Sequence, residues 1–173
     1  MNIHFTPLTA SDIAKFQKWL RQPHVLEFWT DPLTDEEIQR KYEGHIQSAW
    51  VFPYLIWHQD QPIGYIQAYH ATSEGNGWWP NEKEGTYGMD LYIGEPTFLN
   101  RGLGSQVLQH FIRYFEKEHK VAKWIIDVSP ENPRAIRCYE KAGFKRTGPV
   151  DTPDGKAELM VAAPFCTTLK RLI

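Results

Sequence analysis

The stretch Phe98-Leu99-Asn100-Arg101-Gly102-Leu103-Gly104-Ser105 is a basic turn with two glycines, and it runs directly into a long amphipathic pattern. Beyond the turn, apolar residues recur at helical spacing at Leu103, Val107, Leu108, Phe111 and Phe115. Gly102 and Gly104 therefore fall at a helix start, where backbone N–H groups lack partners and the helix dipole is positive. Glycine leaves those groups accessible, so the pattern predicts a phosphate-binding loop. The alternative is a plain turn, because short glycine motifs often occur without a ligand.

The composition is ordinary for a globular protein. With 173 residues, 42% hydrophobic and 23% charged, the sequence predicts one domain spanning 1–173. A net charge of −2 argues against nucleic acid as a partner. The two cysteines, Cys138 and Cys166, and the scattered histidines show no metal-ligand spacing, so we expect neither a metal site nor a disulfide framework. No signal peptide or membrane-spanning run is visible, so we expect a cytoplasmic protein without a membrane partner.

The remaining patterns predict a mixed α/β sheet. After a first strand at 3–7, capping-box signals at 9–12 and 34–37 open two helices, and the segment 23–29 between them is expected to be a loop. Strand patterns follow at 50–58, 63–70, 85–93, 124–128, 144–150 and 156–162. Helical patterns cover 103–120 and 135–142. The expected order is strand, two helices, three strands, helix, strand, helix and two strands, within one α/β domain.

Tryptophan is abundant, with seven in the chain, and three of them fall in expected loops beside acidic residues. These are Trp29, Trp78 and Trp79. Aromatic faces next to carboxylates suit a ligand that is cationic and ring-shaped. The alternative is that the indole rings simply cover the core.

The segment Asn132-Pro133-Arg134-Ala135-Ile136-Arg137-Cys138-Tyr139-Glu140-Lys141-Ala142-Gly143-Phe144 resembles the N-x-x-A-x-x-x-Y-x-K-x-G-F helix of the GCN5-related N-acetyltransferase (GNAT) superfamily. The stretch 98–105 is similar to the acetyl-CoA pyrophosphate loop of that superfamily, Q/R-x-x-G-x-G/A, from which it departs at Leu99. The resemblance implies a GNAT fold of about seven strands and four helices, acetyl-CoA as co-substrate and no metal. The implied coenzyme-binding residues are Tyr92, Ile93, Asn100, Arg101, Gly102, Leu103, Gly104, Ser105, Asn132, Ala135 and Tyr139.

A narrower resemblance, to aminoglycoside 6′-N-acetyltransferases, covers most of the chain. It is carried by the stretches 24–29, 62–69, 77–79, 88–90, 127–130 and 152–155. The resemblance implies an acyltransferase that acetylates a primary amine of a cationic aminosugar. The implied substrate-binding residues are Trp29, Tyr69, Glu74, Trp79, Asp90, Asp127 and Asp154. One departure concerns an acid that the family has before Gly77, where this chain has Asn76, with Glu74 two residues away.

Acetyl transfer from a thioester needs a group that accepts a proton from the attacking amine, and Asp90 is the candidate base. Its alternative role is a strand-end aspartate bonded to the backbone. By resemblance, backbone N–H groups around 91–93 would hold the thioester carbonyl, and Tyr139 would be a general acid near the sulfur. The alternative for Tyr139 is packing alone. Asp127 either pairs with a substrate ammonium or caps the turn at Ser129, whereas Asp154 is also an ordinary turn residue.

Two other functions remain open at this point. One is a GNAT enzyme that acylates a siderophore precursor or another small amine, because that group shares the His-x-x-x-x-Trp pattern at 24–29. The other is a non-catalytic module that binds acetyl-CoA or a drug. The sequence leaves the assembly as monomer or homodimer.

Overall fold

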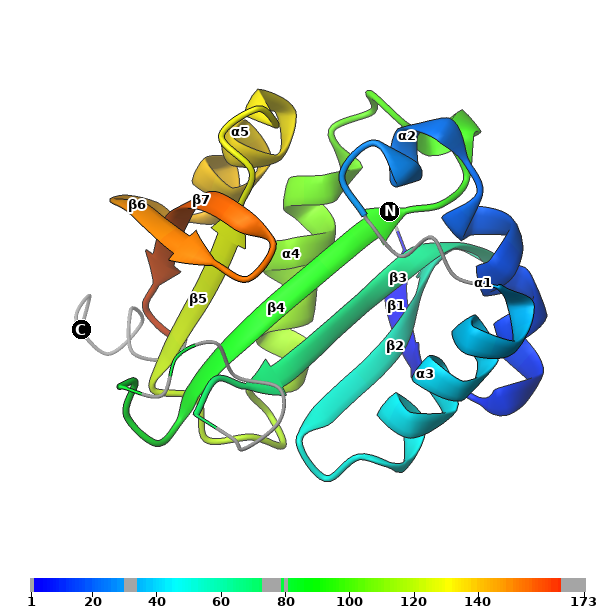
Figure 1. Ribbon diagram of the computed structural model, residues 1–173, viewed down its shortest axis with the longest axis horizontal. Helices are drawn as coiled ribbons and strands as arrows, with labels where there is room; N and C mark the ends of the chain where they lie inside the picture. Colours follow the sequence, from blue (N-terminus) through cyan, green and yellow to red (C-terminus); the bar gives the residue numbers. More distant parts are fainter. Residues whose placement is uncertain (1, 30–33, 73–78, 80, 166–173) are drawn as a thin grey trace. The chain divides into compact units, whose positions relative to one another are not determined.

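The computed structural model describes residues 2–29, 34–72, 79 and 81–165. Seven strands hydrogen-bond into one mixed sheet in the order β1-β2-β3-β4-β5-β7-β6 (Figure 1). The strands are β1 (Ile3–Pro7), β2 (Val51–His58), β3 (Gln61–His70), β4 (Thr86–Ile93), β5 (Lys123–Val128), β6 (Lys145–Thr152) and β7 (Gly155–Ala162). The α-helices of the described ranges are α1 (Ile13–Leu20), α2 (Pro23–Leu26), α3 (Asp35–Gln47), α4 (Leu103–Phe115) and α5 (Pro133–Ala142). The 3₁₀ turns η1 (Ala10–Asp12) and η2 (Pro96–Phe98) precede α1 and α4.

The mixed sheet and the element order predicted from the sequence are confirmed, with two local differences. The segment expected to be a loop contains α2, because Gln22 is extended and Pro23 stands at the first helical position, where its fixed φ suits a helix start. The helix expected to reach about residue 120 ends at Phe115. Beyond it, the Lys117 and Glu118 N–H groups bond to carbonyls three residues back, the tighter pattern of a helix end.

The chain divides into two compact units, each with its own core. Unit 1 comprises Met1–Ala68 and Asp90–Arg101, and unit 2 comprises Tyr69–Met89 and Gly102–Ile173. The single domain expected from the sequence stays a prediction.

The core of unit 1 is an aromatic cluster beneath α1 and α3, which pack against each other (Figure 1). Phe16 of α1 is fully buried, and its ring centroid lies 4.4 Å from that of Tyr42 and 4.5 Å from that of Tyr65. The tilted and edge-to-face ring geometries are those that aromatic pairs favour. These contacts hold the two helices against β3.

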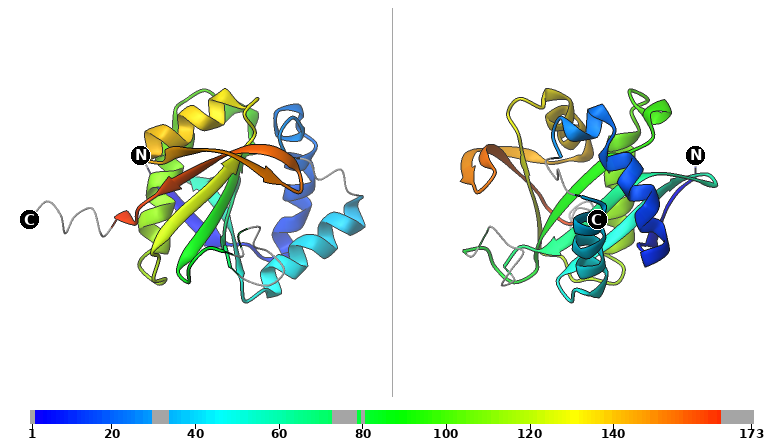
Figure 2. Two further views of the ribbon diagram at one scale, coloured as in Figure 1. Left: turned by 60° about the vertical axis from the view of Figure 1, so that its left-hand side comes forward. Right: turned by 45° about the vertical axis from the view of Figure 1, so that its right-hand side comes forward.

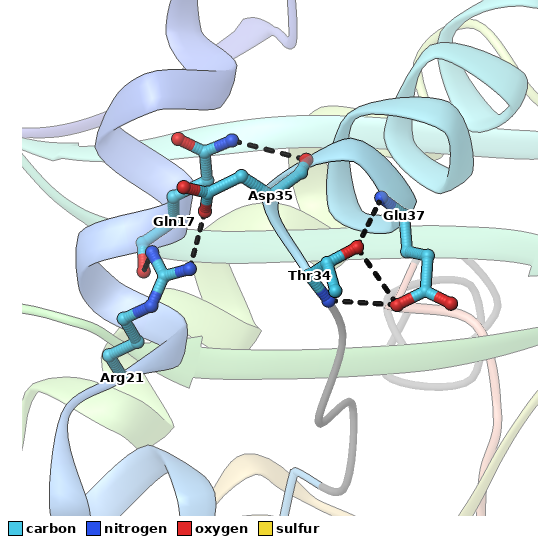
Figure 3. Close-up of polar contacts among 5 residues, drawn as sticks. All are labelled: Gln17, Arg21, Thr34, Asp35 and Glu37. Carbon is cyan, nitrogen blue, oxygen red and sulfur yellow. Dashed lines mark hydrogen bonds and ion pairs between the residues drawn. The ribbon is translucent and has the colours of Figure 1, made fainter.

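The start of α3 is capped and tied to α1 (Figure 3). The Thr34 hydroxyl accepts the Glu37 N–H (3.3 Å), and the Glu37 carboxylate accepts the Thr34 N–H (2.8 Å), as the capping-box pattern predicts. The pKa of Glu37 is lowered mainly by the hydrogen bond from the Thr34 backbone N–H and next by the hydrogen bond with the Thr34 side chain. Arg21 pairs with Asp35, and the Gln17 amide donates to the Asp35 carbonyl oxygen (3.3 Å).

In unit 2, α4 and α5 pack against each other, and the hairpin β6–β7 continues the sheet beyond β5 (Figure 2). The buried carboxylate of Glu158 stabilises this hairpin at a β-bulge between Arg146 and Gly148. Its Oε2 accepts from Arg146 Nη2 (3.1 Å), and its Oε1 accepts the Gly148 N–H (3.1 Å). The hydrogen bond and charge of Arg146 lower the pKa of Glu158.

Replacing Glu158 with Gln tests this hairpin. Because the folded pKa lies below the ordinary 4.5, the carboxylate stabilises the fold above pH 4.5, and this contribution is lost as the pH falls through the folded value. We expect Glu158→Gln to lower the melting temperature at pH 7 by about 2–4 °C, and by less at pH 3. Thermal unfolding followed by circular dichroism measures both values. The exposed Glu131→Gln serves as the control, and a deficit independent of pH would contradict the assignment.

Candidate active site

The end of β4 is held by His24 of α2. The His24 Nε2 atom lies 2.9 Å from the carbonyl oxygen of Ile93. A carbonyl oxygen only accepts hydrogen bonds, so this imidazole nitrogen carries the proton. The contact fixes the peptide that follows Ile93, at the strand end where the family resemblance implies that the thioester carbonyl binds.

The residues directly after β4 are held by Trp19 of α1. A Cβ atom on Gly94 would lie 2.2 Å from the indole ring, so only glycine fits this position. The indole Nε1 donates to Glu95 Oε1 (2.8 Å), and the N–H groups of Gly94 and Glu95 both donate to the Ile63 carbonyl oxygen (2.8 and 3.1 Å). The backbone therefore leaves the strand in one defined direction.

Asp90 lies half-buried on β4, where its Oδ2 accepts a hydrogen bond from Gln67 Nε2 of β3 (2.8 Å). Trp29 is also half-buried in unit 1, with its ring edge-to-face against Tyr92 (centroids 4.9 Å apart) and Tyr65 (6.1 Å). Unit 1 thus contains the Asp90 carboxylate and a cluster of aromatic rings that includes Trp29.

The glycine-rich turn leads into α4 with left-handed backbone at Asn100 (φ 60°) and Gly102 (φ 71°). Gly102 is the N-cap residue and has no side chain to bond the first N–H groups of the helix. The Arg101 guanidinium is exposed, 5.4 Å from the centroid of the Phe98 ring. Leu103 is buried, and the Ser105 hydroxyl donates to the Gly102 carbonyl oxygen (3.3 Å). A helix start with these features can bind an anion.

Gly104 lies where α4 meets α5. A Cβ atom at this position would lie 2.7 Å from the Sγ atom of Cys138. Burial raises the pKa of the Cys138 thiol to about 11. The thiol therefore stays protonated at neutral pH and acts as a packing group, not as a nucleophile.

The motif helix α5 is capped by Asn132, whose Oδ1 accepts the Ala135 N–H (3.0 Å). At its other end, Gly143 is left-handed (φ 107°), and the ring of Tyr139 packs edge-to-face on Phe144 (centroids 6.0 Å apart). Tyr139 is buried, with 8% of its surface exposed. The helix thus places Asn132 and Ala135 in one capped turn.

Two further acids predicted to bind substrate interact in unit 2. Burial raises the pKa of Asp127 on β5, and the charge of Asp154 raises it further, although a backbone hydrogen bond opposes both. Asp154 itself is exposed in the β6–β7 turn. The turn after Asp127 is closed by Ser129, whose carbonyl oxygen accepts the Asn132 N–H (2.9 Å) and whose hydroxyl accepts the Glu131 N–H (3.3 Å). A bound cation would favour the charged form of Asp127, which burial and the charge of Asp154 disfavour.

The other predicted residues are placed as follows. Tyr69 is buried, and its ring packs directly on the backbone of Gly88. A Cβ atom on Gly88 would lie 2.1 Å from the Cζ atom of Tyr69. Trp79 is half-buried, and its Nε1 has no hydrogen-bond partner among the described residues. Glu74, Asn76 and Trp78 lie outside the described residues.

Two absences hold for the described part of the chain. No group of three histidine, cysteine or acidic side chains in it could hold a metal ion. None of its helices combines the length and apolar character that crossing a membrane requires.

Comparison with known proteins identifies the family. The acetyltransferase (GNAT) domain family matches residues 9–152. The chain belongs to the GNAT acetyltransferase family. Aminoglycoside N(6′)-acetyltransferase type 1 of Klebsiella pneumoniae is 37% identical over 159 residues, which cover 89% of this chain and 79% of that protein.

Other relatives of this GNAT protein include solved structures. AAC(6′)-Ib in complex with parmomycin and acetyl-CoA is similar with a TM-score of 0.91 and 35% identity, covering 99% of this chain and 98% of that one. N(6)-hydroxylysine O-acetyltransferase of Escherichia coli is 25% identical over 162 residues, 88% of this chain and 49% of that protein. The GNAT resemblance of the motifs is therefore confirmed, whereas the role of each residue stays a prediction.

Several residues that position the site were not predicted as site residues. They are Trp19, His24, Tyr65, Gln67 and Glu95. Their partners are up to 76 positions away in the sequence, and strand register decides which residues meet. His24 is half-buried, with its Nε2 atom against the Ile93 carbonyl oxygen of β4.

A double-mutant cycle tests the contact between α4 and α5. Gly104→Ala forces a methyl group against the Cys138 sulfur, so we expect a lower melting temperature and a dissociation constant for coenzyme A raised about tenfold. In the Cys138→Ala background the sulfur is gone, and we expect most of both effects to disappear.

Isothermal titration calorimetry and thermal unfolding measure the cycle. Gly44→Ala is the matched control, because a Cβ atom on Gly44 in α3 meets nothing within 4 Å. Strictly additive effects of the two substitutions would contradict the contact.

Proposed function

We propose that the protein transfers the acetyl group of acetyl-CoA to the 6′-amine of an aminoglycoside, directly and within a ternary complex. The observation that carries the proposal is the half-buried carboxylate of Asp127 on β5, whose pKa is raised by burial and, to a smaller extent, by the charge of Asp154. A charged carboxylate in this environment costs free energy, and a bound cation would offset that cost. Structures of the relative AAC(6′)-Ib in complex with parmomycin, ribostamycin and kanamycin support an aminoglycoside as that cation.

The coenzyme half of the proposal rests on unit 2 and on the turn that precedes α4. In the proposed complex the pyrophosphate lies at the start of α4 near Gly102 and Gly104, with Arg101 supplying positive charge. Asn132, Ala135 and Tyr139 of α5 are further proposed coenzyme contacts. Relatives bound to coenzyme A or acetyl-CoA support this assignment.

Acetyl transfer then needs three groups. The neutral amine attacks the thioester carbonyl, and the new C–N bond forms as the C–S bond breaks. Asp90 takes the proton of the amine, directly or through water. Backbone N–H groups of 91–93 stabilise the negative charge on the carbonyl oxygen, and Tyr139 gives a proton to the departing thiolate. A thiol with a pKa of about 8.5 leaves readily, so we expect Tyr139 to help without being essential.

The acceptor amine is a separate part of the proposal. The proposed contacts of the sugar rings are Trp29, Tyr69, Trp79 and Glu74. The proposed location of the protein is the cytoplasm. The relative named N(6)-hydroxylysine O-acetyltransferase makes a small siderophore-precursor molecule the second candidate acceptor. A polycation fits the paired acids better, because two carboxylates can each bind one ammonium group.

Steady-state acetylation assays with Asp90→Asn test the base. Loss of the proton acceptor is expected to lower kcat with kanamycin by about 100- to 1000-fold, with little change in the KM for acetyl-CoA. Asp60→Asn, in the exposed turn before β3, is the control. Wild-type protein is assayed with kanamycin, ribostamycin, spermidine and N(6)-hydroxylysine.

The outcomes separate two questions. Absence of wild-type turnover with every aminoglycoside would overturn the proposed function. Turnover that is insensitive to Asp90→Asn would overturn only the assignment of the base.

Asp127→Asn is expected to stabilise the fold while weakening substrate binding. The raised pKa means that the charged form destabilises the folded state at neutral pH, a cost that is relieved as the pH falls toward 3.8. We expect a melting temperature higher by about 2–4 °C at pH 7, together with a KM for kanamycin raised about tenfold. Asp151→Asn, exposed on β6, is the control. A destabilised variant with unchanged KM would show that Asp127 is structural.

A further inference from the structure

We propose that Gln67 is a positioning residue for Asp90, and that the hydroxyl of Tyr65 sets the direction in which the Gln67 amide faces. The inference rests on the proposed function in one respect, namely that Asp90 is the base. It concerns a hydrogen-bonded chain within unit 1, running from Tyr65 through Gln67 to Asp90 across the neighbouring strands β3 and β4.

The hydrogen-bonded chain consists of two bonds of normal length. The Tyr65 hydroxyl donates to Gln67 Oε1 (2.7 Å), and Gln67 Nε2 donates to Asp90 Oδ2 (2.8 Å). Tyr65 and Gln67 are two positions apart on β3, so their side chains emerge on the same face of the strand. Both links can therefore form at once.

Chemistry allows only one direction for this chain. An ionised carboxylate only accepts hydrogen bonds, so the Gln67 group facing Asp90 must be the amide nitrogen. The amide oxygen then faces Tyr65, whose hydroxyl must donate. Both bonds point their donors toward Asp90, and each strengthens the other by polarisation.

The Tyr65 end of this hydrogen-bonded chain is rigid because the Tyr65 ring is packed in the core. Tyr65 is fully buried, and its ring lies 4.5 Å from Phe16, 5.6 Å from Tyr42 and 5.7 Å from Tyr92 between centroids. The Trp29 ring meets it edge-on at 6.1 Å. A catalytic side chain supported in this way keeps the orientation that proton transfer needs.

The inference predicts separate effects on turnover and on coenzyme binding. Gln67→Leu removes the donor to Asp90, so we expect kcat to fall about tenfold, while the KM for acetyl-CoA changes less than about twofold. Tyr65→Phe keeps the ring and loses only the hydroxyl, and we expect a smaller fall, of about threefold. Gln67→Glu places a second carboxylate against Asp90, and the fall in kcat is expected to be the largest of the three.

The double variant is the decisive comparison. If Tyr65 acts through Gln67, Tyr65→Phe adds nothing once Gln67→Leu is present, and the two effects are not additive. If Tyr65 acts only by packing, the losses multiply, which would overturn this part of the proposal. Gln39→Leu is the matched control, because Gln39 Nε2 donates to the Glu43 carboxylate (2.9 Å) on the exposed surface of α3.

A second readout does not depend on turnover. Carbon-13 NMR titration of the Asp90 carboxyl should show its midpoint at higher pH in Gln67→Leu than in the wild type, by about half a unit or more. The direction follows because a carboxylate that loses a donor holds its proton to higher pH. Identical titrations in the wild type and in Gln67→Leu would overturn the inference, even if the wild type acetylates no aminoglycoside and the proposed function fails.

Discussion

The contact between the Trp19 ring and the backbone of Gly94 is the constraint on which the candidate site depends most. A strand that carries functional groups at its end must stop at one place and leave in one direction. The indole ring fills the space of a side chain at Gly94, its N–H holds Glu95, and His24 holds the carbonyl of Ile93. Together these contacts leave the end of β4 little freedom, which suits a strand whose N–H groups are proposed to bind a carbonyl oxygen.

Acidic residues of unit 2 show two opposite environments. Glu158 has an arginine partner and a backbone donor, and its pKa is lowered. Asp127 on the neighbouring strand is half-buried, and its pKa is raised by burial and by the charge of Asp154. A carboxylate with an arginine partner and a backbone donor stabilises the fold. A carboxylate whose charged form is disfavoured by its surroundings is a feature of functional sites. The contrast separates a structural carboxylate from one whose proposed partner is the substrate.

Local signals predicted most of the fold. The capping boxes at Thr9 and Thr34 and the left-handed Gly143 lie where their patterns indicated. The errors are at short elements and ends: the single turn of α2 lacks a hydrophobic period long enough to detect, and the end of α4 lies in a charged segment without a strong stop signal. These features depend on a few backbone bonds that composition does not encode.

The sequence by itself determined the family and the residue types of the site, because the glycine turn before α4 and the α5 motif have fixed local spacing. Only the tertiary structure decided which other side chains contact and position these site residues. The bond from Gln67 to Asp90 and the contact of Cys138 with Gly104 join residues distant in the sequence. Strand register and helix packing select such partners, and both are set by the burial of whole faces, not by any local pattern.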